Sequence, residues 1–322
     1  MKKYLVLREA DGFVFEVGED LLSEQLRRKF KGYGFRMLAP VSKQSFSAPM
    51  VEESTSGRKK LVYVANHNQK GVDDTEGHIS RAFEELGWDV TKVQEGATTF
   101  PEGDVMLYHK WVPPAWDGIK VCWYFDKIYF NNRDDQVEKI IEASDFFFAT
   151  DGDGIAKLDN PKCHILRQGV GYDCRGGKEI QAPEIAFLGT LYGEREEWYK
   201  ELKKRYEGKI QHFTGISGAG LNDLCVSAKI FLAPPYPSTE NYWSNRVYDT
   251  VGRGGFILHP ECNLDIEVTT YTDDLFEKID YYLENEDERE KIRLACRDQV
   301  REHYTYKDRV KELCSKLSIK EN

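Results

Sequence analysis

The most informative stretch of the sequence is Ala233-Pro-Pro-Tyr-Pro-Ser-Thr-Glu-Asn-Tyr-Trp-Ser-Asn-Arg-Val-Tyr-Asp-Thr-Val-Gly-Arg-Gly-Gly-Phe-Ile-Leu258. A buried strand ends at a proline-rich loop, a polar helix begins at Ser244-Asn245-Arg246, and Gly254-Gly255 opens the next strand. Free amide hydrogens at the helix start, together with Arg246, would hold a diphosphate. Asp249, one turn further in, could accept two hydrogen bonds from a ribose. The stretch therefore predicts a site for a nucleoside diphosphate.

Short apolar strands and helices alternate on both sides of this stretch, which is typical of a mainly parallel, doubly wound sheet. In the first series, strands are expected at 61–65, 89–93, 105–108, 121–125, 146–149 and 164–166, and helices at 75–86 and 136–143. In the second series, strands are expected at 185–188, 210–213, 230–233 and 255–258, and helices at 195–205, 221–227 and 245–251. Closing helices are expected near 273–283, 286–303 and 307–317. We therefore predict an α/β protein with two tandem Rossmann-like domains, at residues 58–170 and 171–322.

Residues 1–57 differ from the rest and are predicted to form a small basic α+β appendage and linker. Strands are expected at 4–7 and 13–17, followed by a helix at 21–30. Residues 1–60 carry a net charge of +4, concentrated at 27–31 and 58–60, whereas the whole chain carries −10. The basic clusters are either a solvated helix face or a surface that binds a polyanionic acceptor.

The composition excludes several classes of protein. The chain has 322 residues and a mean hydropathy of −0.60, which excludes disordered, collagen-like and membrane-embedded proteins. The net negative charge makes nucleic acid an unexpected partner. Seven scattered cysteines without Cys-x-x-Cys spacing argue against a disulfide framework and a zinc site. We expect a cytoplasmic monomer or dimer without a membrane span.

Over residues 61–316 the sequence resembles the group 1 glycosyltransferases of the GT-B fold, especially the bacterial and phage branch that includes the spore-maturation protein CgeB. The sharpest likeness is Asn245-Arg246-Val247-Tyr248-Asp249 followed by Gly254-Gly255-Phe256. Further likenesses are Phe187-Leu-Gly189-Thr-Leu-Tyr-Gly193-Glu-Arg195 and Leu166-Arg-Gln-Gly169-Val170. The resemblance implies two Rossmann-like domains, with the last helices returning to brace the first.

The resemblance also implies that the second domain binds a nucleotide-diphosphate sugar, with a UDP-sugar expected, and that no metal or other cofactor is required. The donor contacts that it implies are Gly189, Arg195, Tyr242, Asn245, Arg246, Asp249 and Gly254. The larger family has a second Glu eight residues before its ribose-binding carboxylate. Here that position is Asn241, with Glu240 adjacent.

Three side chains of the first domain are candidates for catalysis. His109 ends a strand at the edge where open α/β sheets bind ligands, so it is either a base or sugar contact or a structural histidine. Asp126 matches an Asp common in the CgeB-like branch and is either an acceptor contact or a turn residue. His78 is the third candidate, as a catalytic base.

The first turn of the helix at 75–86 is expected on the acceptor side of the cleft. It carries Asp74, Thr75 and Glu76, with Thr75 predicted as the N-cap. Capping alone is the alternative explanation for Asp74 and Thr75.

One motif competes with this interpretation, and a glycine-rich segment has two possible roles. Asp151-Gly-Asp153 resembles the metal site of GT-A glycosyltransferases, but a second βαβ series argues against that fold, so a surface turn is expected. Gly215-Ile-Ser-Gly-Ala-Gly220 is either a simple loop or a nucleotide contact.

The sequence thus predicts a metal-independent glycosyltransferase that moves a sugar to an acceptor hydroxyl of unknown identity. One alternative is a phage-type enzyme that glycosylates hydroxymethylated bases in DNA. Others are a non-catalytic nucleotide-sugar-binding module and a nucleotide-sugar 2-epimerase.

Overall fold

The computed structural model of the chain describes residues 3–8, 13–18, 35–41, 58–67, 74–130, 134–171, 174, 176–235 and 239–317. Contacts between Cα atoms divide the chain into two compact units, Met1–Gly57 and Arg58–Asn322. Among the described residues, a helix with the length and hydropathy needed to cross a bilayer is not found.

The N-terminal unit contains a three-stranded antiparallel sheet in the order β2-β1-β3. Its strands are β1 (Lys3–Arg8), β2 (Phe13–Gly18) and β3 (Phe35–Val41). The two predicted strands are confirmed, and β3 adds a third that the sequence did not indicate. The predicted helix at 21–30 and the basic cluster at 27–31 lie outside the described residues.

The second unit begins with a six-stranded parallel sheet in the order β5-β4-β6-β7-β8-β9. Its strands are β4 (Lys60–Ala65), β5 (Asp89–Gln94), β6 (Val105–Tyr108), β7 (Ile119–Tyr124), β8 (Phe146–Ala149) and β9 (Cys163–Ile165). Its helices are α2 (Thr75–Glu85), α3 (Asp134–Ala143) and α4 (Gly152–Leu158). Helix α4 is absent from the expected elements.

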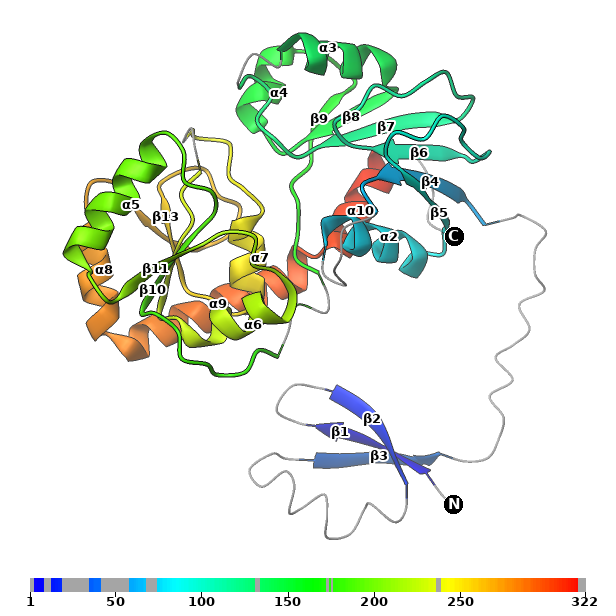
Figure 1. Cartoon of the computed structure of the whole chain (residues 1–322). Coiled ribbons are helices and arrows are strands. Elements are labelled where there is room, and N and C mark those ends of the chain that lie inside the picture. Colours follow the sequence, from blue (N-terminus) through cyan, green and yellow to red (C-terminus); the bar gives the residue numbers. More distant parts are fainter. Residues whose placement is uncertain are drawn as a thin grey trace. The chain divides into compact units, whose positions relative to one another are not determined.

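Both faces of this first sheet are covered. Apolar side chains of α3 and α4 pack on one face. On the other face α2 packs beside α10 (Tyr306–Lys316), whose Val310 and Leu313 are fully buried in the same cluster as Ile79 and Trp123. The last helix of the chain therefore completes the core of the first sheet, and Figure 1 shows α10 beside α2.

A second parallel sheet follows, of five strands in the order β11-β10-β12-β13-β14. Its strands are β10 (Ile185–Leu188), β11 (Ile210–Phe213), β12 (Ile230–Leu232), β13 (Ile257–Pro260) and β14 (Thr269–Tyr271). Its helices are α5 (Glu194–Arg205), α6 (Gly218–Ser227), α7 (Arg246–Gly252), α8 (Leu275–Glu284) and α9 (Glu286–His303). Figure 1 shows the strands between α5 and α8 on one side and α6, α7 and α9 on the other. The predicted α/β class with two doubly wound sheets is confirmed.

The order of the strands locates the ligand-binding edge of the second sheet. The chain leaves β10 toward β11 on one side and returns to β12 on the other, so the connections diverge between β10 and β12. Ligands of open α/β sheets bind at the carboxyl ends of the strands on either side of such a point. The loops that follow Leu188 and Leu232 are therefore the expected site.

His259 on β13 makes the stability of this sheet depend on pH. The side chain is fully buried, its Nδ1–H donates to the Pro260 carbonyl at 2.7 Å, and its Nε2 has no partner among the described residues. Burial lowers the pKa of His259 to about 4, whereas an unfolded histidine titrates near 6.5. The unfolded state thus binds more protons in this window, and stability is lost as the pH falls from about 6.5 to 4.

Replacing His259 by glutamine is expected to reduce the decline in unfolding free energy that occurs as the pH falls from 6.5 to 4. The histidine accounts for up to roughly 3 kcal/mol of the decline in unfolding free energy between pH 6.5 and 4. Urea unfolding at both pH values, for the protein and the variant, measures the difference. If the unfolding free energy falls equally in the two proteins, His259 is not the source of the pH dependence.

Candidate functional site

A cavity of about 210 Å³ opens at the carboxyl ends of β10 and β11. It is lined by Leu188, Gly189, Thr190, Phe213, Thr214, Gly215, Ile216, Leu221, Arg246, Asp249 and Thr250. Three residues predicted to bind the donor, Gly189, Arg246 and Asp249, therefore meet in one place. Gly215 and Ile216 also line the cavity, which favours the nucleotide-contact interpretation of the 215–220 segment.

Two guanidinium groups converge on Gly189. A Cβ placed on this glycine would lie 2.6 Å from Nη2 of Arg195 and 2.8 Å from Cζ of Arg246. Arg195 is 1% exposed, and its Nη2 donates to the Leu188 carbonyl at 2.6 Å. Burial and then the charge of Arg246 lower the pKa of Arg195. Arg246 lines the cavity. Arg195 does not line it, but its guanidinium lies beside Gly189 and adds positive charge next to the cavity.

Neither guanidinium is neutralised within the part of the chain that the structure describes. No carboxylate of these residues lies within 4.0 Å of a nitrogen of Arg195 or Arg246. The Nε of Arg195 is buried and has no hydrogen-bond partner among the residues that the structure describes. Two adjacent like charges repel, so a bound anion would stabilise the pair. This arrangement suits a diphosphate, which guanidinium groups bind by charge-assisted hydrogen bonds.

Asp249 is held by an arginine that the sequence analysis did not single out. Nε and Nη2 of Arg253 both lie 3.3 Å from Oδ1 of Asp249. Arg253 is 3% exposed, and its Nη1 also contacts Oδ1 of Asn222 and the Gly218 carbonyl. Arg253 thus ties the predicted ribose carboxylate to the start of α6. The Asp249–Arg253 spacing of four residues within a helical pattern was the available signal.

The remaining predicted donor residues lie in different places. Asn245 precedes α7, makes no capping bond through its side chain, and has a buried Oδ1 without a partner among the described residues. Tyr242 lies between the two sheets, with Nζ of Lys127 5.7 Å from the centre of its ring. The structure does not bring Gly254 to the cavity, because this glycine precedes β13 and its carbonyl accepts from Arg293 of α9 at 2.7 Å.

The first turn of α2 approaches the donor side through Tyr306. The Tyr306 hydroxyl lies 3.3 Å from Oγ1 of Thr75. Burial raises the pKa of Tyr306. The negative charges of Asp249 and Glu76 raise this pKa further, because both carboxylates disfavour the phenolate. Burial and the charge of Asp74 raise the pKa of Glu76. That Asp74, Thr75 and Glu76 lie on the acceptor side of the cleft stays a prediction.

The predicted cap of α2 needs correction. Asp74, not Thr75, is the N-cap, because its extended backbone precedes the helix and its side chain accepts from the Gly77 amide. Thr75 is the first helical residue, and its hydroxyl is directed to Tyr306.

Both ring nitrogens of His109 are engaged. Nδ1 lies 2.7 Å from the Trp123 carbonyl, so it carries the proton, and Nε2 accepts from the Tyr63 hydroxyl at 2.8 Å. Burial, opposed by the hydrogen bond to Trp123, lowers the pKa of His109 to about 4. The ring is therefore neutral at pH 7, and it can act as an acceptor base only if the bond to Tyr63 is exchanged for one to substrate.

The other two catalytic candidates are also packed against neighbours. His78 is 8% exposed, stacks on Tyr306 with ring centres 5.6 Å apart, and lies 3.8 Å from Sγ of Cys174. Asp126 forms an ion pair with Lys110 near the end of β7. The structure does not bring His78, His109 and Asp126 together in one cluster.

The Asp151–Asp153 segment is not the expected surface turn. Asp151 is 1% exposed, caps α4 through the Gly154 amide at 3.1 Å, and accepts from the Ile128 amide at 2.9 Å. Both oxygens of Asp153 accept from Asn241. All four carboxylate oxygens are therefore occupied by protein donors, which disfavours the alternative metal site.

The basic cluster at 58–60 is partly engaged within its own unit. Arg58 pairs with Asp89 at 3.6 Å, and Nζ of Lys59 lies 5.6 Å from the centre of the Trp88 ring. These contacts agree with a solvated surface.

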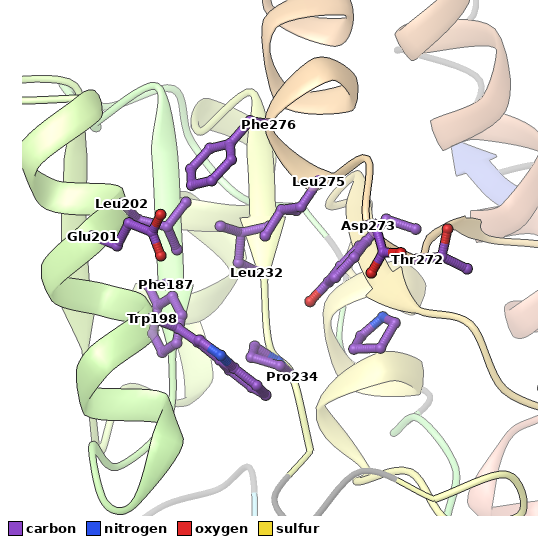
Figure 2. Close-up of a pocket in the computed structure, with 12 residues that line it drawn as sticks. Phe187, Trp198, Glu201, Leu202, Leu232, Pro234, Thr272, Asp273, Leu275 and Phe276 are labelled. Atoms are coloured by element: carbon purple, nitrogen blue, oxygen red, sulfur yellow. The ribbon is translucent and has the colours of Figure 1, made fainter.

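A larger cavity, of about 510 Å³, opens on the opposite face of the second sheet, between α5 and α8. Figure 2 shows Trp198 reaching from α5 toward Pro234, with Thr272 and Asp273 across the cavity. Its ionisable lining residues are the acidic Glu201 and Asp273 together with Tyr271, with no arginine or lysine among the described residues that line it. The smaller cavity at Arg246 is therefore the one whose charge suits a diphosphate.

Comparison with known proteins agrees with this architecture. Residues 179–315, which hold the second sheet and its helices, match the family model described as glycosyl transferase-like. A search of curated proteins found no match to the chain.

Solved structures of the same fold share little sequence with the chain. Anabaena HepE in complex with UDP and glucose is 8% identical, with a TM-score of 0.55, over 81% of this chain and 100% of that one. Sucrose-phosphate synthase from Thermosynechococcus elongatus is 9% identical, with a TM-score of 0.58, over 81% and 99%. An α1,3-fucosyltransferase with GDP-fucose is 12% identical, with a TM-score of 0.50, over 84% and 94%. The chain therefore has the GT-B glycosyltransferase fold.

Proposed function

We propose that the protein is a glycosyltransferase that moves a sugar from a nucleotide-diphosphate sugar to an acceptor hydroxyl. The observation that carries the proposal is the pair Arg195 and Arg246, which converges on Gly189 at the carboxyl ends of the second sheet. The matched family model and the structural neighbours, which include complexes with UDP and with GDP-fucose, support the same class of donor.

In this proposal the chain's own side chains stabilise the departing diphosphate without a metal ion. Arg246 contacts the phosphates, Arg195 reinforces the positive potential, and Asp249, fixed by Arg253, orients the ribose. The acceptor enters on the side of the first sheet, near Thr75 and Glu76. A UDP-sugar is the donor that we expect to be preferred.

The segment Asn245 to Phe256 also supports a place in the CgeB-like branch. The proposal covers transfer of a hexose or a pentose to a glycan, a small molecule or a modified DNA base. The cytoplasmic location and a monomeric or dimeric state stay predictions.

Nucleotide release from UDP-, GDP-, ADP- and TDP-sugars, measured with EDTA present, tests the proposal. We expect release from one donor, unaffected by EDTA and reduced in Arg246→Ala and Asp249→Ala. Donor binding without release would point to a non-catalytic module, and isomerised sugar to an epimerase. Release that EDTA abolishes would overturn the metal-independent mechanism.

A further inference from the structure

Asn241 makes several contacts between the first sheet and the loop from β12 to α7, which we call the donor loop. Nδ2 of Asn241 donates to Oδ1 of Asp153 at 2.7 Å, and its backbone amide donates to Oδ2 of the same carboxylate at 3.1 Å. In return, the Asn241 carbonyl accepts from the Gly152 amide at 2.9 Å. Asp153 and Gly152 belong to α4 of the first sheet, whereas Asn241 belongs to the second.

The remaining polar groups of Asn241 are also occupied. Its Oδ1 accepts from Nδ2 of Asn263 at 3.0 Å, and its carbonyl accepts a second bond from Nη2 of Arg167 at 3.0 Å. The Arg167 guanidinium stacks on Trp243, 3.7 Å from the ring centre. The side-chain Nδ2 and Oδ1 of Asn241 are therefore both hydrogen-bonded within the protein and are not directed at a ligand.

We infer that Asp153 and Asn241 form an interdomain clamp that positions the donor loop, which makes Asn241 a positioning residue. At this position the family that the chain resembles has a carboxylate. Here a carboxylate would meet that of Asp153, and adjacent like charges repel. The amide at 241 and the carboxylate at 153 are thus a matched pair.

Independent contacts surround the clamp. A Cβ on Gly152 would lie 3.0 Å from Cβ of Asn241 and 3.1 Å from its carbonyl oxygen, so the two backbones approach closely. Nζ of Lys127 donates to Oγ1 of Thr239 at 3.0 Å. Burial alone would raise the pKa of Asp153, but hydrogen bonds from Asn241 and Thr239 and the charge of Lys127 lower it. The carboxylate is therefore ionised when it accepts both bonds.

The clamp is linked to the donor cavity through Trp243 and α7. Trp243 is 3% exposed and its Nε1 donates to the Tyr248 hydroxyl at 3.1 Å. Arg246 lies between these two residues in the chain and lines the cavity. Displacement of the loop would therefore move Arg246, which is the part of the inference that rests on the proposed function.

A reciprocal exchange of the two side chains tests the clamp. We expect Asn241→Asp alone to raise the donor KM about tenfold, because two carboxylates then face each other, and Asp153→Asn alone to raise it several-fold. The double variant Asn241→Asp/Asp153→Asn restores an amide opposite a carboxylate and should return KM to within about twofold of the original. Asn160→Asp, which keeps its acceptor bond to the Lys162 amide, is the charge-matched control.

Hydrogen exchange at the Asn241 and Gly152 amides gives a readout that does not depend on activity. Exchange should accelerate in Asn241→Asp and recover in the double variant. If exchange follows this pattern while no donor is turned over, the clamp stands and the proposed function fails. If Asn241→Asp raises activity, or if the double variant recovers neither exchange nor KM, the clamp is wrong.

Discussion

Arg246→Ala is expected to weaken binding of a nucleoside diphosphate by roughly 30- to 100-fold. The substitution removes the guanidinium that lines the cavity, and hydrogen bonds to a charged partner contribute about 2–3 kcal/mol. Burial lowers the pKa of Arg246, and no carboxylate of the described residues is paired with it. Its loss therefore leaves no acid unpaired nearby, and the folded state should tolerate it.

Arg205→Ala is the matched control for this prediction. Arg205 lies on α5 of the same sheet and pairs with Asp280 at 2.6 Å on the surface, away from the cavity. Its removal should change UDP affinity less than twofold, because exposed ion pairs contribute little. Equal affinities for Arg246→Ala and the unmodified protein, in calorimetric titrations with UDP, would exclude Arg246 from the donor site.

Gly189→Ala should impair both the fold and the donor site. Gly189 has φ +102°, a conformation that side chains rarely adopt, and an added Cβ would lie 2.6–2.9 Å from atoms of Arg195 and Arg246. We expect a loss of about 1–3 kcal/mol in unfolding free energy from backbone strain. We also expect at least a tenfold loss of UDP affinity, because the methyl group must displace a guanidinium.

Gly208→Ala separates these two effects. Gly208 also has a positive φ, +75°, but an added Cβ would have no atom within 4 Å. This variant should lose stability through strain alone and keep its UDP affinity. If Gly189→Ala retains affinity as well, the guanidinium groups are not arranged as described.

The regular elements were largely predictable because apolar periodicity is local. Strands β6, β8, β10 and β11 have the predicted bounds; β6 and β10 are continuous buried runs and β8 is nearly so, whereas β11 is buried only at Ile210. Strand β14 lacks that signal, because all three of its residues are only partly buried. Helix α4 begins with Gly152-Asp153-Gly154, which favours a turn, and is fixed instead by the Asp151 cap.

The donor side of the site was predictable where residues follow a strand or lie on the next helix. Gly189 and Arg246 meet because parallel strands present their carboxyl ends at one edge. Gly254 was placed by resemblance, but it precedes its strand and therefore lies at the other edge. The spacing of four residues between Asp249 and Arg253 is a local signal for their ion pair, but the contacts of Arg253 at 218 and 222 come from a different helix and do not show in a local pattern.

Contacts between the two sheets could not be predicted from local patterns. Tyr306 lies 231 positions from Thr75 in the chain, and Asn241 lies 88 positions from Asp153. The engagement of both nitrogens of His109 likewise depends on Tyr63 and Trp123 of neighbouring strands. Burial and partners of such residues are set by packing, which a single sequence does not reveal.

Calorimetric titration with UDP, GDP, ADP and TDP, and with the matching nucleosides, tests the central claim most directly. If Arg246 and Arg195 form a diphosphate site, at least one diphosphate should bind with EDTA present, at least tenfold more tightly than its nucleoside. That preference should weaken as salt is added, because added ions screen charge. Absence of binding by all four diphosphates, or equal affinity for diphosphate and nucleoside, would contradict the account.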